Sequence, residues 1–224
     1  VCNEMDACGV PNYDDCSCSD LCGVPNGDNS SCEIITDIDG NEYGTVQIGE
    51  QLWMKQNLKV TQYNDGSEIT TGLDNGAWSS TTDGAYAIYA DNLSNQETYG
   101  NLYNWYAVDD GRGVCPVGWQ VPSDDEYKTL EIFLGMSEEE ANYIGWRGGD
   151  VGSKLAGNAE LWNDGILEEN SEFGTSGFNG LPGGFRHESI GSYYLYVIDG
   201  HFWSSSEANG NYVWGRSFNY NRTD

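Results

Sequence analysis

The stretch from Gly177 to Arg186 constrains the fold more than any other part of the sequence. It reads Gly-Phe-Asn-Gly-Leu-Pro-Gly-Gly-Phe-Arg, and a second aromatic run, Phe-Trp-Ser-Ser-Ser-Glu, follows at residues 202–207. Neither run has the period of a helix or a strand. Glycines and a proline beside aromatic rings instead indicate tight turns with the rings packed across them. The pattern is a fold signature and contains no catalytic triad, phosphate loop or metal-ligand set.

Length and composition favour one sizeable domain with an appendage. The chain has 224 residues, of which 8 are Trp, 15 Tyr and 6 Phe, while 30 glycines indicate many turns and short strands. We therefore expect a disulfide-stapled arm over residues 1–32 and a domain over residues 33–224 whose core is largely aromatic.

Local patterns predict strands, then helices, then strands. A hairpin should turn at residues 39–41 and point Trp53 inward, and residues 64–98 should form a long loop. Capping boxes should begin one helix at Ser123 and a second at Ser137. The first helix should bury Tyr127, Leu130, Phe133 and Leu134. Further strands are expected at residues 193–198, 201–206 and 213–220, so the domain is predicted to be α+β.

Several blocks in the same order resemble a bacterial family, the Fibrobacter succinogenes major paralogous domain. The blocks lie at residues 37–43, 45–58, 63–66, 99–107, 115–123, 177–186 and 202–207. The resemblance covers nearly all of residues 37–218 and implies a secreted or surface protein of bacteria. The residues that mark its fold are Trp53, Trp119, Phe178, Gly183, Gly184, Arg186 and Trp203.

Residues 118–127 are in addition similar to a segment of the formylglycine-generating enzyme-like group. This similarity implies a C-type-lectin-like fold with short curved antiparallel sheets and two helices. The activity of that group is not implied, because those enzymes use a cysteine pair near the C-terminus and this chain has no cysteine after Cys115. His187 and His201 are isolated and receive no role, so we expect a protein that is not an enzyme.

Six of the seven cysteines lie in the first 32 residues, a density typical of disulfides formed in an oxidising compartment. They are Cys2, Cys8, Cys16, Cys18, Cys22 and Cys32. A Cys-Gly-Val-Pro-Asn repeat, at residues 8–12 and 22–26, resembles short repeats that precede many bacterial surface domains. Calcium at Asp14, Asp15 and Asp28 is one interpretation of the acidic residues here, and simple turns are the other. No cofactor is otherwise expected.

The net charge of −27 makes nucleic acid and anionic membranes poor partners. Uncharged glycans and divalent cations are compatible with this charge as partners. No apolar stretch is long enough for membrane insertion. Three sequons, at Asn29, Asn92 and Asn221, mark where glycans would be attached if the producing cell glycosylates. The chain starts at Val1 within a cysteine pattern, as a processed product of a longer precursor would.

Relatives in this family usually continue into a final strand whose cysteine could pair with the one that matches Cys115. Loss of that strand would expose a sheet edge and invite completion by another chain. We therefore expect an extracellular or cell-surface structural or adhesive subunit that self-associates through its arm, as a homo-oligomer or filament. The alternative is a carbohydrate-binding module that uses surface aromatics such as Trp78 or Trp214.

Overall fold

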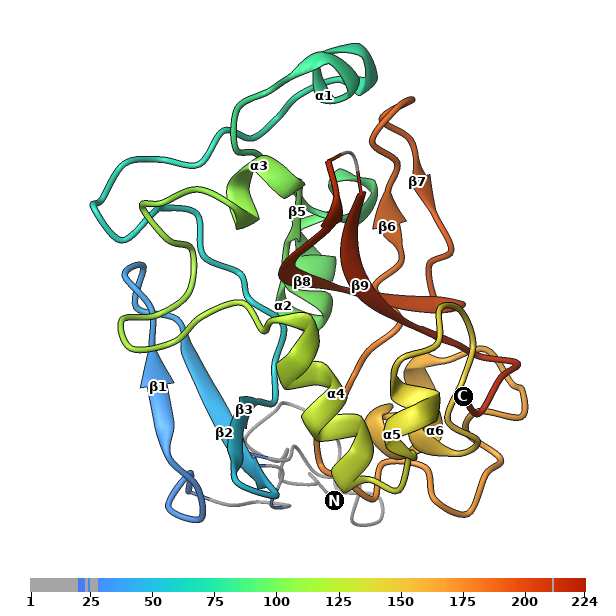
Figure 1. Cartoon of the computed structure of the whole chain (residues 1–224). Coiled ribbons are helices and arrows are strands. Elements are labelled where there is room, and N and C mark those ends of the chain that lie inside the picture. Colours follow the sequence, from blue (N-terminus) through green and yellow to red (C-terminus); the bar gives the residue numbers. More distant parts are fainter. Residues whose placement is uncertain (1–19, 23, 25–27, 211) are drawn as a thin grey trace, which may run out of the picture.

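The computed structural model describes residues 20–22, 24, 28–210 and 212–224 (Figure 1). Its strands pair only with antiparallel neighbours in one three-stranded sheet, β1-β2-β3, and three two-stranded ones within this described part. The strands are β1 (Ile34–Thr36), β2 (Glu42–Ile48), β3 (Gln51–Met54), β4 (Tyr86–Ala87), β5 (Leu102–Tyr103), β6 (Phe185–Arg186), β7 (Tyr193–Tyr194), β8 (Asp199–Asn209) and β9 (Tyr212–Asn219). Mixed helices and short antiparallel sheets confirm the predicted α+β class.

The helices are short and connect or cover these sheets. They are α1 (Asn75–Ser80), η1 (Tyr89–Asp91), α2 (Leu93–Tyr99), α3 (Trp105–Val108), α4 (Asp124–Phe133), α5 (Glu138–Ala141), α6 (Val151–Leu155) and η2 (Ala159–Leu161). In Figure 1, α4 runs between the β1-β2-β3 sheet and the pair α5 and α6, with the β8-β9 hairpin above it. None of the helices in the described part is long and apolar enough to span a bilayer.

The two predicted helices are α4 and α5, and both capping boxes are present. The hydroxyls of Ser123 and Ser137 accept from the backbone N–H three residues later. The carboxylates of Glu126 and Glu140 in turn accept from the backbone N–H of Ser123 and Ser137. The expectation of only two helices is wrong, because α1, α2, α3 and α6 also form. The long loop expected at residues 64–98 contains two of them. Helices of four to seven residues show too little periodicity to be recognised in a sequence.

The buried face of α4 differs from the prediction at two positions. Tyr127 and Leu130 are buried as expected, but Phe133 is 62% exposed, and its ring lies against Gly49 in the β2–β3 turn. Glu131 is buried instead. Glu131 is buried because Arg147 and Arg216, from elsewhere in the chain, contact its carboxylate.

Arg216, on β9, is the centre of a buried ion network. Its guanidinium contacts Glu131 through Nε and lies 3.0 Å from Asp124 Oδ1, and Arg147 contacts Glu131 at 3.0 Å. Lys128 also pairs with Asp124 at 2.8 Å. These contacts tie α4 to the last strand, 85 and 92 residues further along the chain.

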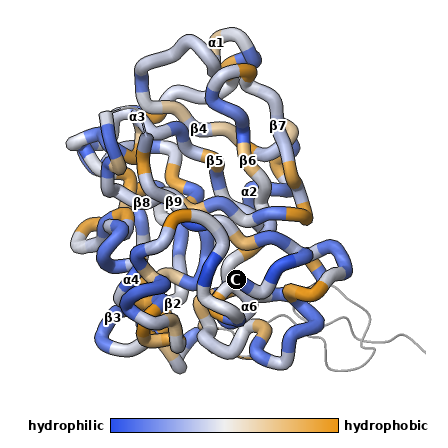
Figure 2. The backbone as a smooth tube through the Cα atoms, turned by 45° about the vertical axis from the view of Figure 1, so that its right-hand side comes forward, coloured by the Kyte–Doolittle hydropathy of each residue, from blue (hydrophilic) through white to orange (hydrophobic). Residues whose placement is uncertain are grey.

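The core is built from aromatic rings of distant segments. Trp53 lies 5.5 Å from Tyr127 and from Phe178, and Phe202 bridges Phe178 and Phe218 at 6.0 and 5.2 Å between ring centres. Around α4, β2 and β3 the trace in Figure 2 carries several hydrophobic stretches close together. Trp53 therefore points inward, as predicted.

Gly184 occupies a position that no other residue type suits. Its φ of +63° is left-handed, and a Cβ there would meet the Tyr194 carbonyl and lie 2.9 Å from the Tyr89 ring and 3.0 Å from the Tyr196 nitrogen. Neighbouring Gly183 lacks a positive φ, and its Cβ would have its nearest contact at 3.5 Å.

These two glycines give a matched pair of substitutions. Gly184→Ala is expected to lower the free energy of unfolding by about 2–5 kcal/mol, from left-handed strain plus overpacking. Gly183→Ala should change it by less than about 1 kcal/mol. Urea unfolding followed by tryptophan fluorescence would measure both, and equal effects would contradict this explanation of the glycine pair.

The described part of the arm is held against the domain. Cys22 and Cys32, two of the six cysteines predicted to form disulfides, are paired with each other. The carboxylate of Asp20 accepts from the backbone N–H groups of Cys22, Val24 and Asn29 and organises the turn between them. The remaining arm predictions, at Cys2, Cys8, Cys16, Cys18, Asp14 and Asp15, lie outside the described residues.

Candidate binding groove

A groove of about 450 Å³ opens beside the three-stranded sheet. One wall is β3 with the chain that follows it to Leu58, and the opposite walls are residues 114–122 and the start of β8. Residues 99–103 and 178–184 complete the lining. The Gly-rich segment and the second aromatic run, which stood out in the sequence, therefore meet at this groove.

The edge of β3 that faces away from β2 is unpaired. Lys55 N–H donates to the Gly44 carbonyl at 2.9 Å, and Val46 is opposite Trp53 in the ladder. Because an antiparallel ladder alternates, the backbone N–H and C=O groups of Leu52 and Met54 point to the other side, where the groove lies. Within the described residues no backbone group pairs with them. The groove thus has an open strand edge along one wall.

Aromatic rings and neutral amides dominate the lining. Trp53, Tyr103, Trp119, Tyr127, Phe178, Phe202 and Trp203 contribute rings, and Gln51, Gln56, Asn57, Asn101, Gln120 and Asn179 contribute amides. The charged side chains of the lining already have partners. Lys55 Nζ donates to the Cys22 carbonyl, and Glu126 completes the capping box. Such a lining suits an uncharged ligand with many hydrogen-bonding groups.

Two buried polar atoms in this lining have no hydrogen-bond partner. They are Nε1 of Trp53, whose side chain belongs to a residue only 8% exposed, and Oε1 of Gln51. An unsatisfied buried donor or acceptor costs about 1–3 kcal/mol. One is a donor and the other an acceptor.

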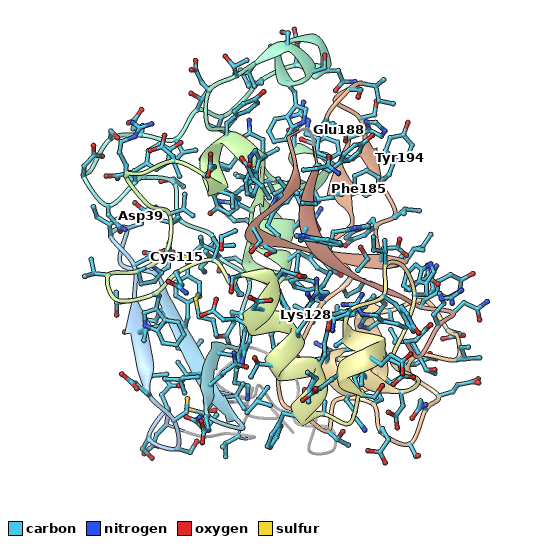
Figure 3. The ribbon with its side chains drawn as sticks, in the orientation of Figure 1. Asp39, Cys115, Lys128, Phe185, Glu188 and Tyr194 are labelled. Carbon is cyan, nitrogen blue, oxygen red and sulfur yellow. A yellow bond between two sulfur atoms is a disulfide. The ribbon has the colours of Figure 1, made fainter. Side chains whose placement is uncertain are left out.

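Cys115 lines the same groove and carries a free thiol. Burial raises the pKa of this thiol to about 11, so it stays protonated at neutral pH. Its backbone carbonyl accepts from the Asn64 amide at 2.9 Å, which fixes the turn before α4. Figure 3 shows Cys115 on the side of the molecule that carries the β1-β2-β3 sheet.

Trp203 and Arg186, two of the predicted fold residues, connect distant segments of the chain. Trp203 Nε1 donates to the Tyr103 carbonyl at 2.8 Å, and its ring lies 5.8 Å from that of Trp105. The buried guanidinium of Arg186 lies 4.5 Å from the centre of the Trp78 ring and donates to the Gly191 and Leu73 carbonyls. The segment after the glycines is thereby tied to the chain before α1.

Trp78 is a correction. It was expected to be a surface ring for sugar binding, but it is only 5% exposed because Arg186 covers it. Trp214 is half-buried, whereas Trp203 is 38% and Trp146 45% exposed. Among the tryptophans singled out in the sequence, Trp53, Trp119 and Trp203 line the groove.

The predicted calcium and glycosylation residues that the structure describes do not gather at one site. Asp28 accepts from the Ser30 N–H at 3.1 Å, which is turn chemistry, and no cluster of three potential metal ligands occurs in the described part of the chain. Asn92 and Asn221 are exposed, while the Asn29 side chain accepts from Leu21 N–H. Calcium binding and glycosylation stay predictions.

His187 and His201 flank an aromatic patch on the hairpin of β6 and β7. The ring of Phe185 stacks on that of Tyr194 with 5.8 Å between their centres, and both residues are labelled in Figure 3. The ring centre of His201 lies 4.9 Å from that of Phe185. His201 Nδ1 is 2.9 Å from Ser217 Oγ, since the two residues are opposite each other in the β8-β9 ladder. Strand register explains this contact, and we assign it no catalytic role.

The model of one protein family, described as the Fibrobacter succinogenes major domain, matches residues 46–223. The chain belongs to this family. Its matched region contains β3, Cys115, the Gly-rich segment and β8, and therefore every wall of the groove. The resemblance inferred from the sequence is confirmed at the level of the family. No curated protein and no solved structure shows significant similarity to the chain.

Proposed function

We propose that the protein is a non-enzymatic structural or adhesive subunit, outside the cell or on its surface, that associates with further copies of itself. The observation that carries the proposal is the open edge of β3 inside a groove with unsatisfied buried polar atoms. An extended segment that pairs with this edge would supply partners for the unpaired backbone groups of Leu52 and Met54 and would cover the aromatic lining. Addition of a strand to an exposed edge is a common mode of peptide recognition.

The N-terminal arm of a neighbouring copy is the occupant that we propose. Residues 1–19 precede Asp20 and span up to about 60 Å when extended, enough to reach another molecule. The arm leaves the domain next to the groove, where the Gln56 amide donates to the Leu21 carbonyl at 3.1 Å. An arm that enters the next copy at the same site generates a head-to-tail polymer unless the rotation closes a ring.

Two further features support this function. The Cys22–Cys32 disulfide is of the kind that persists in an oxidising compartment, which favours the cell exterior. The similarity of residues 118–127 to a C-type-lectin-like segment favours that fold, which we propose for the domain.

The net charge of −27 opposes association at low ionic strength. Salt at 0.15 M reduces the Debye length to about 8 Å and should promote assembly.

The intact chain is the material for the test. Sedimentation velocity from roughly 1 to 100 μM in 0.15 M salt, with negative-stain microscopy of the same samples, should show oligomers or filaments that grow with concentration. A chain that remains strictly monomeric over this range, in both low and moderate salt, would overturn the proposal.

A second candidate function is binding of a neutral polysaccharide, favoured by the rings and amides that line the groove. Trp203→Ala is expected to weaken binding at least about tenfold, because a ring stacked in a binding site is typically worth more than 1 kcal/mol. Trp146→Ala is the matched control, since Trp146 is similarly exposed, at 45% against 38% for Trp203, but lies outside the groove. Affinity electrophoresis in gels that contain neutral glucans, mannans or xylans would measure both variants. Equal behaviour of the two would remove this candidate.

A further inference from the structure

Cys115 has a restricted set of partners within this sequence. The chain has seven cysteines, and Cys22 and Cys32 pair with each other. The remaining four are Cys2, Cys8, Cys16 and Cys18, all in the first 19 residues. Apart from Cys115 of a second copy, a disulfide partner for Cys115 within these 224 residues therefore comes from the segment that we propose as the occupant of the groove.

The thiol does not stand alone as an indication of a ligand. In the same lining, Trp53 Nε1 is more than nine-tenths buried and has no acceptor, and Gln51 Oε1 has no donor. The unpaired backbone groups of Leu52 and Met54 line the groove as well. Three independent features thus converge on one groove: a free thiol, unsatisfied buried polar atoms and an open strand edge.

We propose that Cys115 forms an interchain disulfide with one of the arm cysteines, Cys2, Cys8, Cys16 or Cys18, of a neighbouring copy whose arm lies along β3. The inference rests on the proposed function and adds a covalent link to it. Each subunit would then be joined to the next by a disulfide inside the groove.

The chemistry is thiol–disulfide exchange and requires a disulfide between two arm cysteines as its co-reactant. The Cys115 thiolate attacks one sulfur of that disulfide, a new sulfur–sulfur bond forms, and the old one breaks. The second arm cysteine leaves as a thiolate and takes up the proton that Cys115 released. The number of disulfides does not change, so no external oxidant is consumed.

The raised pKa of the partly buried Cys115 thiol makes the exchange slow at neutral pH. With a pKa of about 11, on the order of 1 in 10,000 of the Cys115 side chains is a thiolate at pH 7. The rate of cross-linking should therefore rise about tenfold per pH unit between pH 7 and pH 10. The other titratable side chains that line the groove are Lys55, Tyr99, Tyr103, Glu126, Tyr127 and His201.

The test uses intact chains labelled with ¹⁴N and ¹⁵N, purified separately without reductant, mixed and allowed to assemble. Peptide mapping by mass spectrometry should find the Cys115 peptide joined to an arm peptide of the opposite label. Gels without reductant should show a ladder that dithiothreitol collapses. Cys115→Ser should lose the ladder and the linked peptide while sedimentation still shows association.

Other outcomes separate this inference from the proposed function. Linked peptides that carry only one label would show closure within a single chain, and they would overturn the inference. Association without any Cys115 link would also overturn it and leave the proposed function standing. A Cys115→Ser/Val117→Cys variant places a thiol on an 89% exposed neighbour. If it links to the arm as well as Cys115 does, the cross-link is non-specific and the inference is wrong. Absence of any association in the wild-type chain would overturn both proposals.

Discussion

Replacement of Arg216 by methionine is expected to lower the free energy of unfolding by about 3–5 kcal/mol. Arg216 is only 7% exposed, and its guanidinium contacts the carboxylates of Asp124 and Glu131, which are also buried. Methionine fills similar space but leaves two negative charges in the interior with less compensation. Arg147 and Lys128 retain one contact each and keep the loss below that of fully isolated charges. Urea unfolding at pH 7 measures the difference.

Arg112→Met is the matched control for this experiment. Arg112 pairs with Asp110 at 2.7 Å, but its side chain is exposed to water. Exposed pairs of this kind contribute about 0–1 kcal/mol, so the control should be close to the wild type. If the two variants are equally stable, the network around Arg216 does not hold α4 to β9.

The same network predicts how stability changes in acid. Burial alone would raise the pKa of Asp124, but hydrogen bonds and charge from Lys128 and Arg216 outweigh it, and the pKa falls below the ordinary value of 3.8. A carboxyl group with a lowered pKa in the folded state stabilises the fold above its unfolded pKa. That contribution is lost as the pH falls below about 4. Arg216→Met should therefore flatten the dependence of unfolding free energy on pH in this range.

Local signals in the sequence predicted the elements that they control. Ser123 and Ser137 begin helices because a capping box needs only residues three positions apart. The β1–β2 turn forms where Asp39 and Gly40 indicated it. The aromatic run at 202–207 lies in β8, as expected for a strand at 201–206. These features depend on neighbours in the chain, which a single sequence shows directly.

Features that depend on distant partners could not be predicted in this way. Glu131 is buried because Arg216 meets it from 85 residues away, and Trp78 is buried because Arg186 lies over its ring. Short helices such as α1 and α2 depend on single caps, at Asp74 and Asn92, without a periodic apolar face. The groove combines β3, Cys115 and β8, and only the fold brings these segments together.

Met54→Pro is expected to weaken self-association about 30- to 100-fold, roughly 2–3 kcal/mol. Proline removes the Met54 N–H, which points into the groove, and its ring occupies the space of the incoming strand. The ladder between β2 and β3 keeps its bonds, because Trp53 and Lys55 make them. An incoming strand would lose one hydrogen bond and bury an acceptor without a partner.

Thr36→Pro tests whether the loss is specific to this edge. Asp37 N–H donates to the Asn41 carbonyl at 3.0 Å, so alternation places the Thr36 N–H on the outer side of β1, at the opposite edge of the same sheet. Both variants add a proline to an edge strand and should lose similar amounts of stability. Only Met54→Pro should lose association in sedimentation equilibrium. If Thr36→Pro weakens association equally, or if Met54→Pro assembles like the wild type, then β3 is not the edge at which copies of the chain meet.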